Sequence, residues 1–309
     1  MQEIISIVLP VFIIVGLGYV ANWRSWLVDT HFDALMKFAT NFAVPCLLFV
    51  AISDLDLSSS FNPDLFISFY SGAFACFLIG VLGARYLFNR DWEDCISIGF
   101  SCFFSNTVML GLPIAERAFG AHSLAPNFAI VSMHSLFCYS IGITAMETVK
   151  ARGRSVLGAV RTVVKGLLRN ILVLSILAAF FVNLSGLTLP GPIVDSFSLI
   201  AKSALPVALF AIGGILFRYK PEGDTKTVLF ICFVSLIIHP AIALLIGTSL
   251  QLSQENLRAV VIMAAVAPGI NSYLFASLYG RAMRVAASSV LFATGFTIIS
   301  ASLWLVILG

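Results

Sequence analysis

The sequence predicts an all-α integral membrane protein: ten transmembrane helices as two inverted repeats of five, with broken crossing helices 4 and 9. Composition is the first observation behind this fold class, because 60% of the 309 residues are hydrophobic, 11% are charged and the mean hydropathy is +1.01. These fractions lie far from those of a soluble domain. The other two observations are the number of apolar stretches and an internal repeat with helix-breaking residues at mid-span.

Charged and turn-forming residues divide the chain into about ten apolar stretches. A helix needs roughly 20 mostly apolar residues to cross the hydrocarbon core of a bilayer. The spans are expected near residues 3–21, 33–53, 64–88, 93–117, 123–148, 168–184, 194–217, 225–249, 255–279 and 283–308. The first is expected to remain as a mature helix, since the residues before it lack the positive charge of a cleaved signal peptide.

Lys and Arg residues collect in the odd-numbered connections and at the span ends beside them. Such residues mark short cytoplasmic loops, so both termini are expected outside. The formal net charge of +3 is therefore an orientation signal. The lipid bilayer is the expected partner, and nucleic acid is not.

The two halves of the chain match after the shift of 161 residues that brings Pro45 onto Pro206. "FAVPCLLF" then aligns with "SALPVALF", and "SNTVMLGLP" aligns with "VAPGINSYL". Five helices per half is an odd number, so the second half enters the membrane from the opposite side, which is typical of secondary transporters. The expected parts are a first repeat (1–148), a basic cytoplasmic linker (149–167) and a second repeat (168–309). The linker is either an amphipathic surface helix or a carrier of topology charges.

Helix-weakening residues lie near the middle of the fourth and ninth spans. In hydrocarbon, an unpaired backbone polar group costs several kcal/mol, so a helix unwinds there only where protein or a wet cavity surrounds the break. The expected helix-break residues are Gly111, Pro113, Pro268 and Gly269. Two half-helix N-termini would meet at this point, and their free N–H groups and positive dipole ends favour an anion.

Neutral polar side chains accompany the expected breaks. The predicted substrate-binding residues there are Asn106, Thr107, Asn271 and Ser272. Neither 106–113 nor 267–274 contains Asp or Glu, which a sodium- or proton-exchanging crossover would be expected to use. The pattern therefore indicates a small organic anion as substrate.

Three further polar residues within the spans are candidates for a role in transport. Lys202, well inside the seventh span, is either a counter-charge to a substrate carboxylate or a side chain that snorkels outward. Asn41, its repeat partner, could line the same cavity. His134, near the middle of the fifth span, either carries a coupled proton or packs as a neutral residue.

Other chemistry is not indicated. The six Cys show no CxxC spacing, so they are interpreted as packing residues, without disulfides, metal site or cofactor. The sequence has no GxSxG, no HExxH and no pair of mid-span Asp residues, which argues against an enzyme. A membrane receptor that binds an anion without moving it would share the pocket.

The sequence resembles the auxin efflux carrier family, in particular its bacterial branch of malonate and other organic-acid permeases. The resemblance covers essentially the whole chain and rests on "LPVFIIVGLGYV", "NFAVPCLLF", "SNTVMLGLPI", "APGINSYLFASLYG" and "AASSVLFATGFTIIS". It implies a fold similar to that of bile acid:sodium symporters and sodium/proton antiporters. Helices 1, 2, 6 and 7 would form a scaffold, which is often dimeric, and helices 3–5 and 8–10 a mobile transport unit.

In the same resemblance, the crossover asparagine and prolines fall on Asn106, Pro113 and Pro268. Asn170 is followed by Ile171, where family members often carry Asn-Pro, and the long central loop of the plant hormone exporters is absent. Both departures weaken a transfer of auxin as the substrate.

The predicted function is transport of a small mono- or dicarboxylate, auxin-like or malonate-like, by an alternating-access, elevator-like mechanism in a bacterial inner membrane. The alternatives are a sodium- or proton-coupled symporter of another, bile-acid-like solute and an anion receptor. Substrate, direction, coupling ion and oligomeric state, including a homodimer through the scaffold, stay open.

Overall fold

The computed structural model describes residues 2–56, 62–150, 171–219 and 224–309, and within them the chain is helical without a β-strand. Most of the predicted basic linker lies outside the described residues. The chain divides into two compact units, each described by itself. Unit 1 comprises Met1–Leu9, Asn62–Val163 and Tyr219–Gly309, and unit 2 comprises Pro10–Phe61 and Val164–Arg218.

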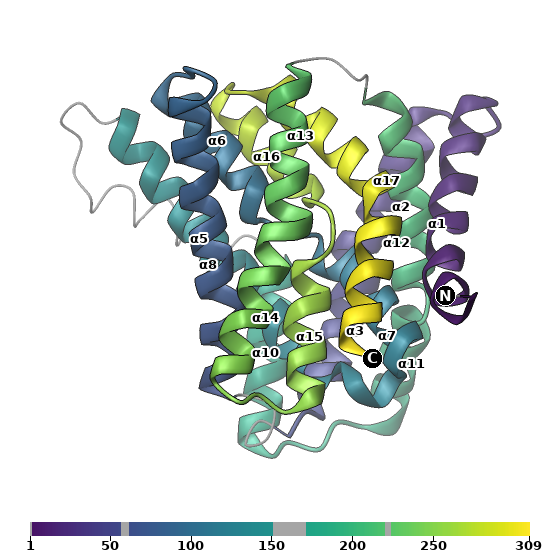
Figure 1. Cartoon of the computed structure of the whole chain (residues 1–309). Helices are drawn as coiled ribbons and strands as arrows, with labels where there is room; N and C mark the ends of the chain where they lie inside the picture. Colours follow the sequence, from purple (N-terminus) through teal and green to yellow (C-terminus); the bar gives the residue numbers. More distant parts are fainter. Residues whose placement is uncertain (1, 57–61, 151–170, 220–223) are drawn as a thin grey trace. The chain divides into compact units, whose positions relative to one another are not determined.

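Nine α-helices of the described chain belong wholly to unit 1 (Figure 1). They are α5 (Pro63–Tyr86), α6 (Trp92–Phe103), α7 (Leu112–Phe119), α8 (Ala125–Lys150), α13 (Thr225–Phe233), α14 (His239–Ser249), α15 (Gln254–Ala264), α16 (Ile270–Tyr279) and α17 (Met283–Leu308). Unit 2 contains most of α1 (Gln2–Trp23), together with α2 (Asp29–Phe38), α3 (Val44–Ser53), α10 (Ile171–Ser185), α11 (Gly191–Ala201) and α12 (Ala204–Arg218).

Among the described residues, seven helical segments are long and apolar enough to cross a membrane. Three of the ten expected spans are not among them, for two reasons. Spans 93–117 and 255–279 are each interrupted near the middle, so neither half reaches membrane length. The described part of span 168–184 is the shorter helix α10. The all-helical membrane class of the prediction is confirmed, whereas ten spans in an inverted repeat stay a prediction.

Three helical spans contain a π-helical turn that ends two residues before a proline. The pairs are Ala39–Ala43 with Pro45, Thr107–Gly111 with Pro113, and Val234–Ile238 with Pro240. Proline has no N–H to donate and its ring clashes with the carbonyl four residues earlier. The wider turn accommodates that clash without ending the helix. In Figure 1, α13 and α14 accordingly run on as one rod, whereas a loop separates α15 from α16.

Close helix packing in unit 1 depends on small residues. A Cβ added to Gly80 of α5 would lie 2.8 Å from the Cα of Gly99 in α6 and 2.7 Å from Cys102 Sγ. Only glycine permits this approach, and α6 is thereby held against α5 at the turns that precede its break.

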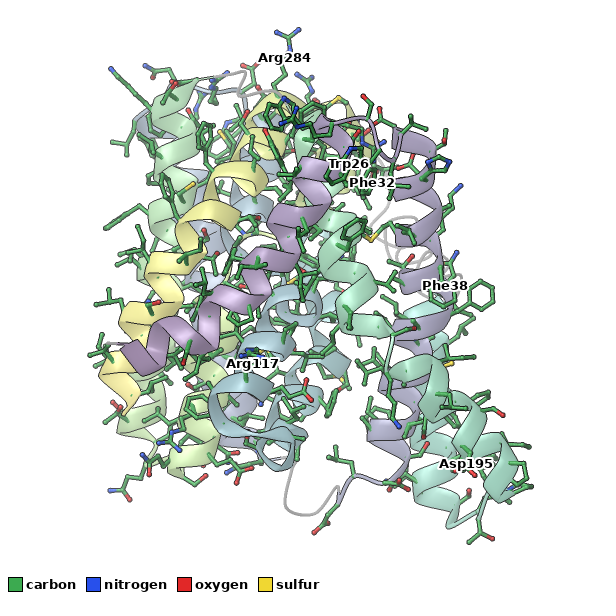
Figure 2. All side chains as sticks on the ribbon, turned by 90° about the vertical axis from the view of Figure 1, so that its right-hand side faces the viewer. Trp26, Phe32, Phe38, Arg117, Asp195 and Arg284 are labelled. Atoms are coloured by element: carbon green, nitrogen blue, oxygen red, sulfur yellow. The ribbon has the colours of Figure 1, made fainter. Side chains whose placement is uncertain are left out.

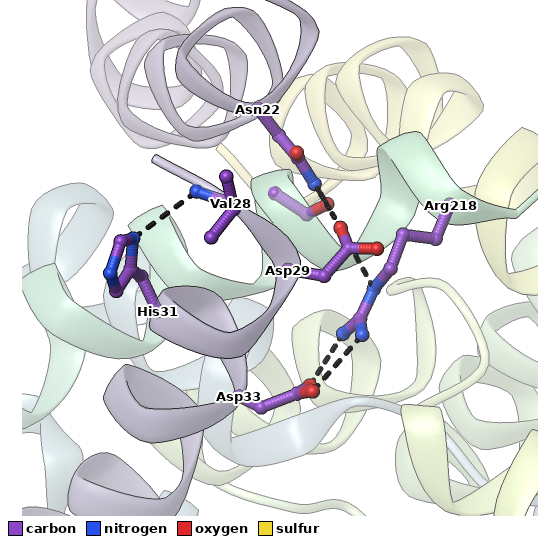
Figure 3. A network of polar contacts seen from close by, with 7 residues as sticks. Asn22, Val28, Asp29, His31, Asp33 and Arg218 are labelled. Carbon is purple, nitrogen blue, oxygen red and sulfur yellow. Dashed lines mark hydrogen bonds and ion pairs between the residues drawn. The ribbon is translucent and has the colours of Figure 1, made fainter. Parts of the chain in front are cut away.

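Unit 2 contains a charged network around Arg218, the last residue of α12 (Figure 3). Its guanidinium donates to both carboxylate oxygens of Asp33, at 3.2 and 2.6 Å, and lies 3.8 Å from Asp29. Asn22 donates to Asp29 at 2.9 Å and to the Gly214 carbonyl at 2.8 Å. These contacts join α1, α2 and α12.

The outer surfaces of the helices are apolar, as the bilayer requires. On α2, Phe32 is fully buried within unit 2, whereas the ring of Phe38 projects outward (Figure 2). Leu245 and Leu278 in unit 1 are 68% and 69% exposed. Exposed apolar surface on this scale indicates contact with lipid.

Candidate functional site

The first break lies between α6 and the π-helical turn that precedes α7. Helix α6 ends at Phe103, and the chain resumes helical geometry at Thr107. The Asn106 side chain caps the new helix by accepting from the Met109 amide at 3.3 Å. The nonhelical residues are therefore 104–106, earlier than the expected interval of 106–113.

Gly111 does not lie in an unwound turn, contrary to the expectation from sequence, whereas Pro113 lies at the start of a helical segment, where a proline is favoured. Gly111 ends the π-helical turn with an ordinary helical φ of −62°, and Pro113 is the second residue of α7. The turn absorbs the proline, as described above. Gly111 instead permits close packing, because an added Cβ would lie 2.6 Å from Met263 Sδ of α15.

The second break separates α15, which ends at Ala264, from α16, which begins at Ile270. Pro268 and Gly269 both lie in the nonhelical segment, and Gly269 is the N-cap residue of α16. The predicted binding residues Asn271 and Ser272 lie in the first turn of α16, and no side-chain hydrogen bond caps this helix. Their polar groups are therefore not used as caps.

The two breaks lie side by side and pair through their backbones. The Asn106 amide donates to the Ala267 carbonyl at 2.8 Å, and the Gly269 amide donates to the Phe104 carbonyl at 2.8 Å. Ser105 and Pro268 thereby form an isolated antiparallel bridge. Backbone N–H and C=O groups that lose their helical partners at the breaks thus form hydrogen bonds with one another, as a buried nonhelical backbone requires.

Hydroxyl groups of α17 complete this pairing. Thr297 Oγ1 accepts from the Ala267 amide at 3.0 Å. Ser300 Oγ lies 2.9 Å from the Leu236 carbonyl and 3.2 Å from the Ala265 carbonyl, and its one hydrogen serves these two acceptors. Neither α17 residue was predicted, because only the tertiary fold brings this helix to the break; the one sequence signal is the hydroxyl-rich series in an otherwise apolar span.

Two predicted binding residues have buried polar atoms without a hydrogen-bond partner. They are Asn106 Nδ2 and Ser272 Oγ. Thr107 is 3% exposed, and Asn271 is half-buried with its Oδ1 accepting from the Tyr139 hydroxyl at 3.3 Å. A buried polar atom without a partner loses the free energy of hydration with no compensation. A ligand that contacts Asn106 and Ser272 would supply the missing bonds.

Two histidines hold Ser105, the bridge residue of the first break. His134 Nε2 of α8 lies 3.1 Å from the Ser105 carbonyl oxygen. Because a carbonyl only accepts, Nε2 carries the hydrogen. His239 Nδ1, at the start of α14, lies 3.3 Å from Ser105 Oγ, and Phe69 packs on both imidazole rings. The contact of His239 was not predicted, because its partner Ser105 lies 134 residues away in the sequence. The role of His134 in proton coupling stays a prediction.

The remaining predicted binding residues, Asn41 and Lys202, belong to unit 2. Both are exposed, and Lys202 lies at the interruption between α11 and α12. Their contribution to the site in unit 1 stays a prediction. Among the described residues, no group of three or more His, Cys, Asp or Glu side chains could hold a metal ion.

Known proteins resemble this chain over nearly its whole length. The family of membrane transport proteins matches residues 3–305. "Uncharacterized transporter YfdV" of Escherichia coli (strain K12) is 24% identical over 300 residues, which cover 96% of this chain and 95% of the relative. "Putative malonate transporter" of Rhizobium meliloti (strain 1021) is 23% identical, covering 95% and 92%. Auxin efflux carrier component 8 of Arabidopsis thaliana is 22% identical, covering 94% and 93%.

The matched proteins are transporters and not enzymes, in agreement with the absence of catalytic motifs from the sequence. Together with the apolar helices, the match identifies a multi-pass membrane protein. The chain belongs to the membrane transport protein family that includes the auxin efflux carriers.

Proposed function

We propose that this membrane transporter carries a small organic anion by alternating access, with the anion bound at the paired breaks of unit 1. The observation that supports this most is the coincidence of two features. The breaks pair through Asn106 and Gly269, and beside them Asn106 Nδ2 and Ser272 Oγ are buried without partners. A neutral polar site at two helix N-termini favours an anion over a cation.

The substrate carboxylate would accept hydrogen bonds from Asn106 Nδ2 and Ser272 Oγ, with Thr107 and Asn271 beside them. No carboxylate side chain occurs in 104–111 or 265–272 to compete for these donors. The family relation adds a substrate class, since one relative is named for malonate and another for auxin, both carboxylates. We therefore place mono- and dicarboxylates first among the candidate substrates.

The proposed architecture is ten spans in two inverted repeats. The helix bounds support it when the first half is shifted by 161 residues. Helix α6 then falls on 253–264, and α15 is Gln254–Ala264. Helix α5 falls on 224–247, and α13 with α14 covers 225–249. The π-helical turn Ala39–Ala43 falls on 200–204, where α11 gives way to α12. Corresponding interruptions are expected if both halves share one fold.

The proposed motion is that of an elevator, with unit 1 as the transport unit and unit 2 as the scaffold. The division of the chain supports this assignment, because unit 1 gathers α5–α8 with α13–α17, while α1–α3 and α10–α12 lie mainly in unit 2. Each proposed repeat thus contributes helices to both units. We further propose a location in the bacterial inner membrane, both termini outside by the Lys and Arg distribution, and a homodimer through unit 2.

The test is a thermal-shift screen of the detergent-purified protein against acetate, malonate, succinate and indole-3-acetate. We expect one carboxylate to raise Tm, since a ligand that binds only the folded state stabilises it. Asn106→Ala should remove this increase, while Asn62→Ala, which alters a helix cap remote from the breaks, should keep it. An increase that survives in Asn106→Ala would contradict the placement of the anion at the breaks.

A further inference from the structure

A pocket lies in unit 1, where α7 ends and α15 begins, apart from the breaks. It has a volume of about 290 Å³ and is lined by Phe119, Ser123, Asn127, Gln254, Glu255, Arg258 and Ala259. Phe119 is the last residue of α7, and four lining residues lie in the first two turns of α15. Arg258 precedes the break by seven residues, roughly 10 Å along the helix, so this pocket is not the site proposed above.

Arg258 supplies the positive charge of this pocket. Its guanidinium stacks on the Phe119 ring, 4.7 Å from the centroid, and donates to the main-chain oxygen of Gly309. These contacts fix the orientation of the group, while its Nε is buried without a hydrogen-bond partner. A held guanidinium with a free N–H is suited to bind a carboxylate.

Asn127 supplies an acceptor that lacks a donor. The residue is 2% exposed, and its Nδ2 donates to the Ser123 carbonyl at 2.9 Å. Because a carbonyl only accepts, the atom of the Asn127 amide that faces Ser123 is the nitrogen, and the atom on the other side is the oxygen. That oxygen is buried and has no partner. It would bind a hydroxyl or ammonium group, which are donors.

Glu255 limits the charge of the occupant. Its carboxylate lines the same pocket one turn before Arg258, so a second negative charge on a ligand would be repelled. The volume lies at the lower end of the range of ligand pockets, which suits a molecule of few heavy atoms.

We infer that this pocket binds a small monocarboxylate with a hydroxyl or ammonium group next to the carboxylate. The carboxylate contacts Arg258, and the neighbouring donor group contacts the Asn127 oxygen. Such an occupant links the end of α7 to the start of α15, the half-helices on one side of the two breaks. The inference does not depend on which anion binds at the breaks.

Isothermal titration of the purified chain with propionate, lactate and alanine tests this inference. The three molecules share a carboxylate and a three-carbon frame but carry, respectively, no donor, a hydroxyl and an ammonium group. We expect lactate or alanine to bind at least about tenfold more tightly than propionate, equivalent to about 1.4 kcal/mol. Equal affinity for all three, or no heat with lactate and alanine, would overturn the inference.

Variants locate the binding. Arg258→Gln and Asn127→Leu should each weaken lactate or alanine about tenfold or more, whereas Arg117→Gln, an arginine outside this pocket, should not. If Asn127→Leu fails to fold, Arg258→Gln decides alone. Glu255→Gln should weaken alanine more than lactate if the occupant is the ammonium compound.

Asn106→Ala separates this inference from the proposed function. It should abolish stabilisation by the transported anion and leave the binding at Arg258 unchanged. If it abolishes both, the ligand binds at the breaks and the pocket assignment is wrong.

Discussion

The breaks of unit 1 and the charged network of unit 2 use polar residues in opposite ways. Around Arg218, each acidic group faces a positive or amide donor, and the contacts join three helices. Around the breaks, the side chains are neutral, the backbones pair, and Asn106 Nδ2 and Ser272 Oγ lack partners. The first arrangement holds helices together. The second leaves hydrogen-bonding capacity for a ligand, at the expense of stability.

The comparison also separates a broken helix from a proline-containing one. Pro45 in unit 2 and Pro113 in unit 1 both follow a π-helical turn, and neither ends its helix. In the fourth and ninth expected spans, the chain leaves the helix at 104–106 and 265–269, where each segment is the hydrogen-bonding partner of the other. An unwound segment in a membrane is stabilised by a second nonhelical segment that pairs with its backbone, and not by the proline itself.

The largest effect is expected from removing a backbone donor of the bridge. Gly269 has a φ of −71°, which proline adopts without strain, so Gly269→Pro keeps the backbone angle but replaces the N–H that bonds the Phe104 carbonyl by a ring carbon that cannot approach this oxygen as closely. Leaving that buried carbonyl unpaired should cost about 1–3 kcal/mol. We expect a lower Tm in detergent and loss of transport.

Gly269→Ala is the matched control for this change. Its Cβ would lie 3.4 Å from Phe104, an ordinary contact, and its amide keeps the bond. Near-normal transport in Gly269→Ala together with loss in Gly269→Pro would assign the effect to the backbone pairing with Phe104, which only the proline variant disrupts. Equal loss in both would point to packing at this position instead.

A smaller effect is expected from Pro113→Ala. Alanine restores an amide that can donate to the Met109 carbonyl, so the wide turn Thr107–Gly111 can tighten to an α-helix and displace Asn106. We expect uptake to fall by about tenfold, equivalent to about 1.4 kcal/mol, while the protein stays folded. Pro45→Ala makes the same change in unit 2, which does not contain the breaks. Similar loss in both variants would show that the position of the turn does not matter.

The helical membrane class and the segments that break were predictable from the sequence, because apolar length and Gly, Pro and Asn residues are local signals. The first break was placed too late, since nothing in the sequence shows that a π-helical turn absorbs Pro113. His239 and Thr297 were missed for a different reason. Their partners, Ser105 and Ala267, lie in the nonhelical break segments far away in the sequence, and only packing brings them together.

The charged network of unit 2 should respond less than the breaks. Arg218 forms a bidentate pair with Asp33 and a longer contact with Asp29, and all three side chains are partly exposed. For such pairs, coupling energies are about 0.2–1 kcal/mol and are screened by salt. In a double-mutant cycle with Arg218→Gln, we expect larger coupling for Asp33→Asn than for Asp29→Asn. The reverse order, measured by Tm at low salt, would contradict the geometry.

The smallest expected effect concerns Asp224, which caps α13 outside the membrane-spanning segment. Hydrogen bonds from Thr227 Oγ1 at 2.7 Å and from the Lys226 amide, with Arg90 nearby, lower the pKa of its carboxyl below the ordinary value. A lowered folded-state pKa adds stability that is present above the unfolded pKa, about 4, and is lost as pH falls toward the folded pKa. Asp224→Ser keeps a capping oxygen but does not titrate. The difference in Tm between wild type and Asp224→Ser should therefore be constant near neutral pH and change only below about pH 4. A difference that changed between pH 6 and 8 would show that another group senses this substitution.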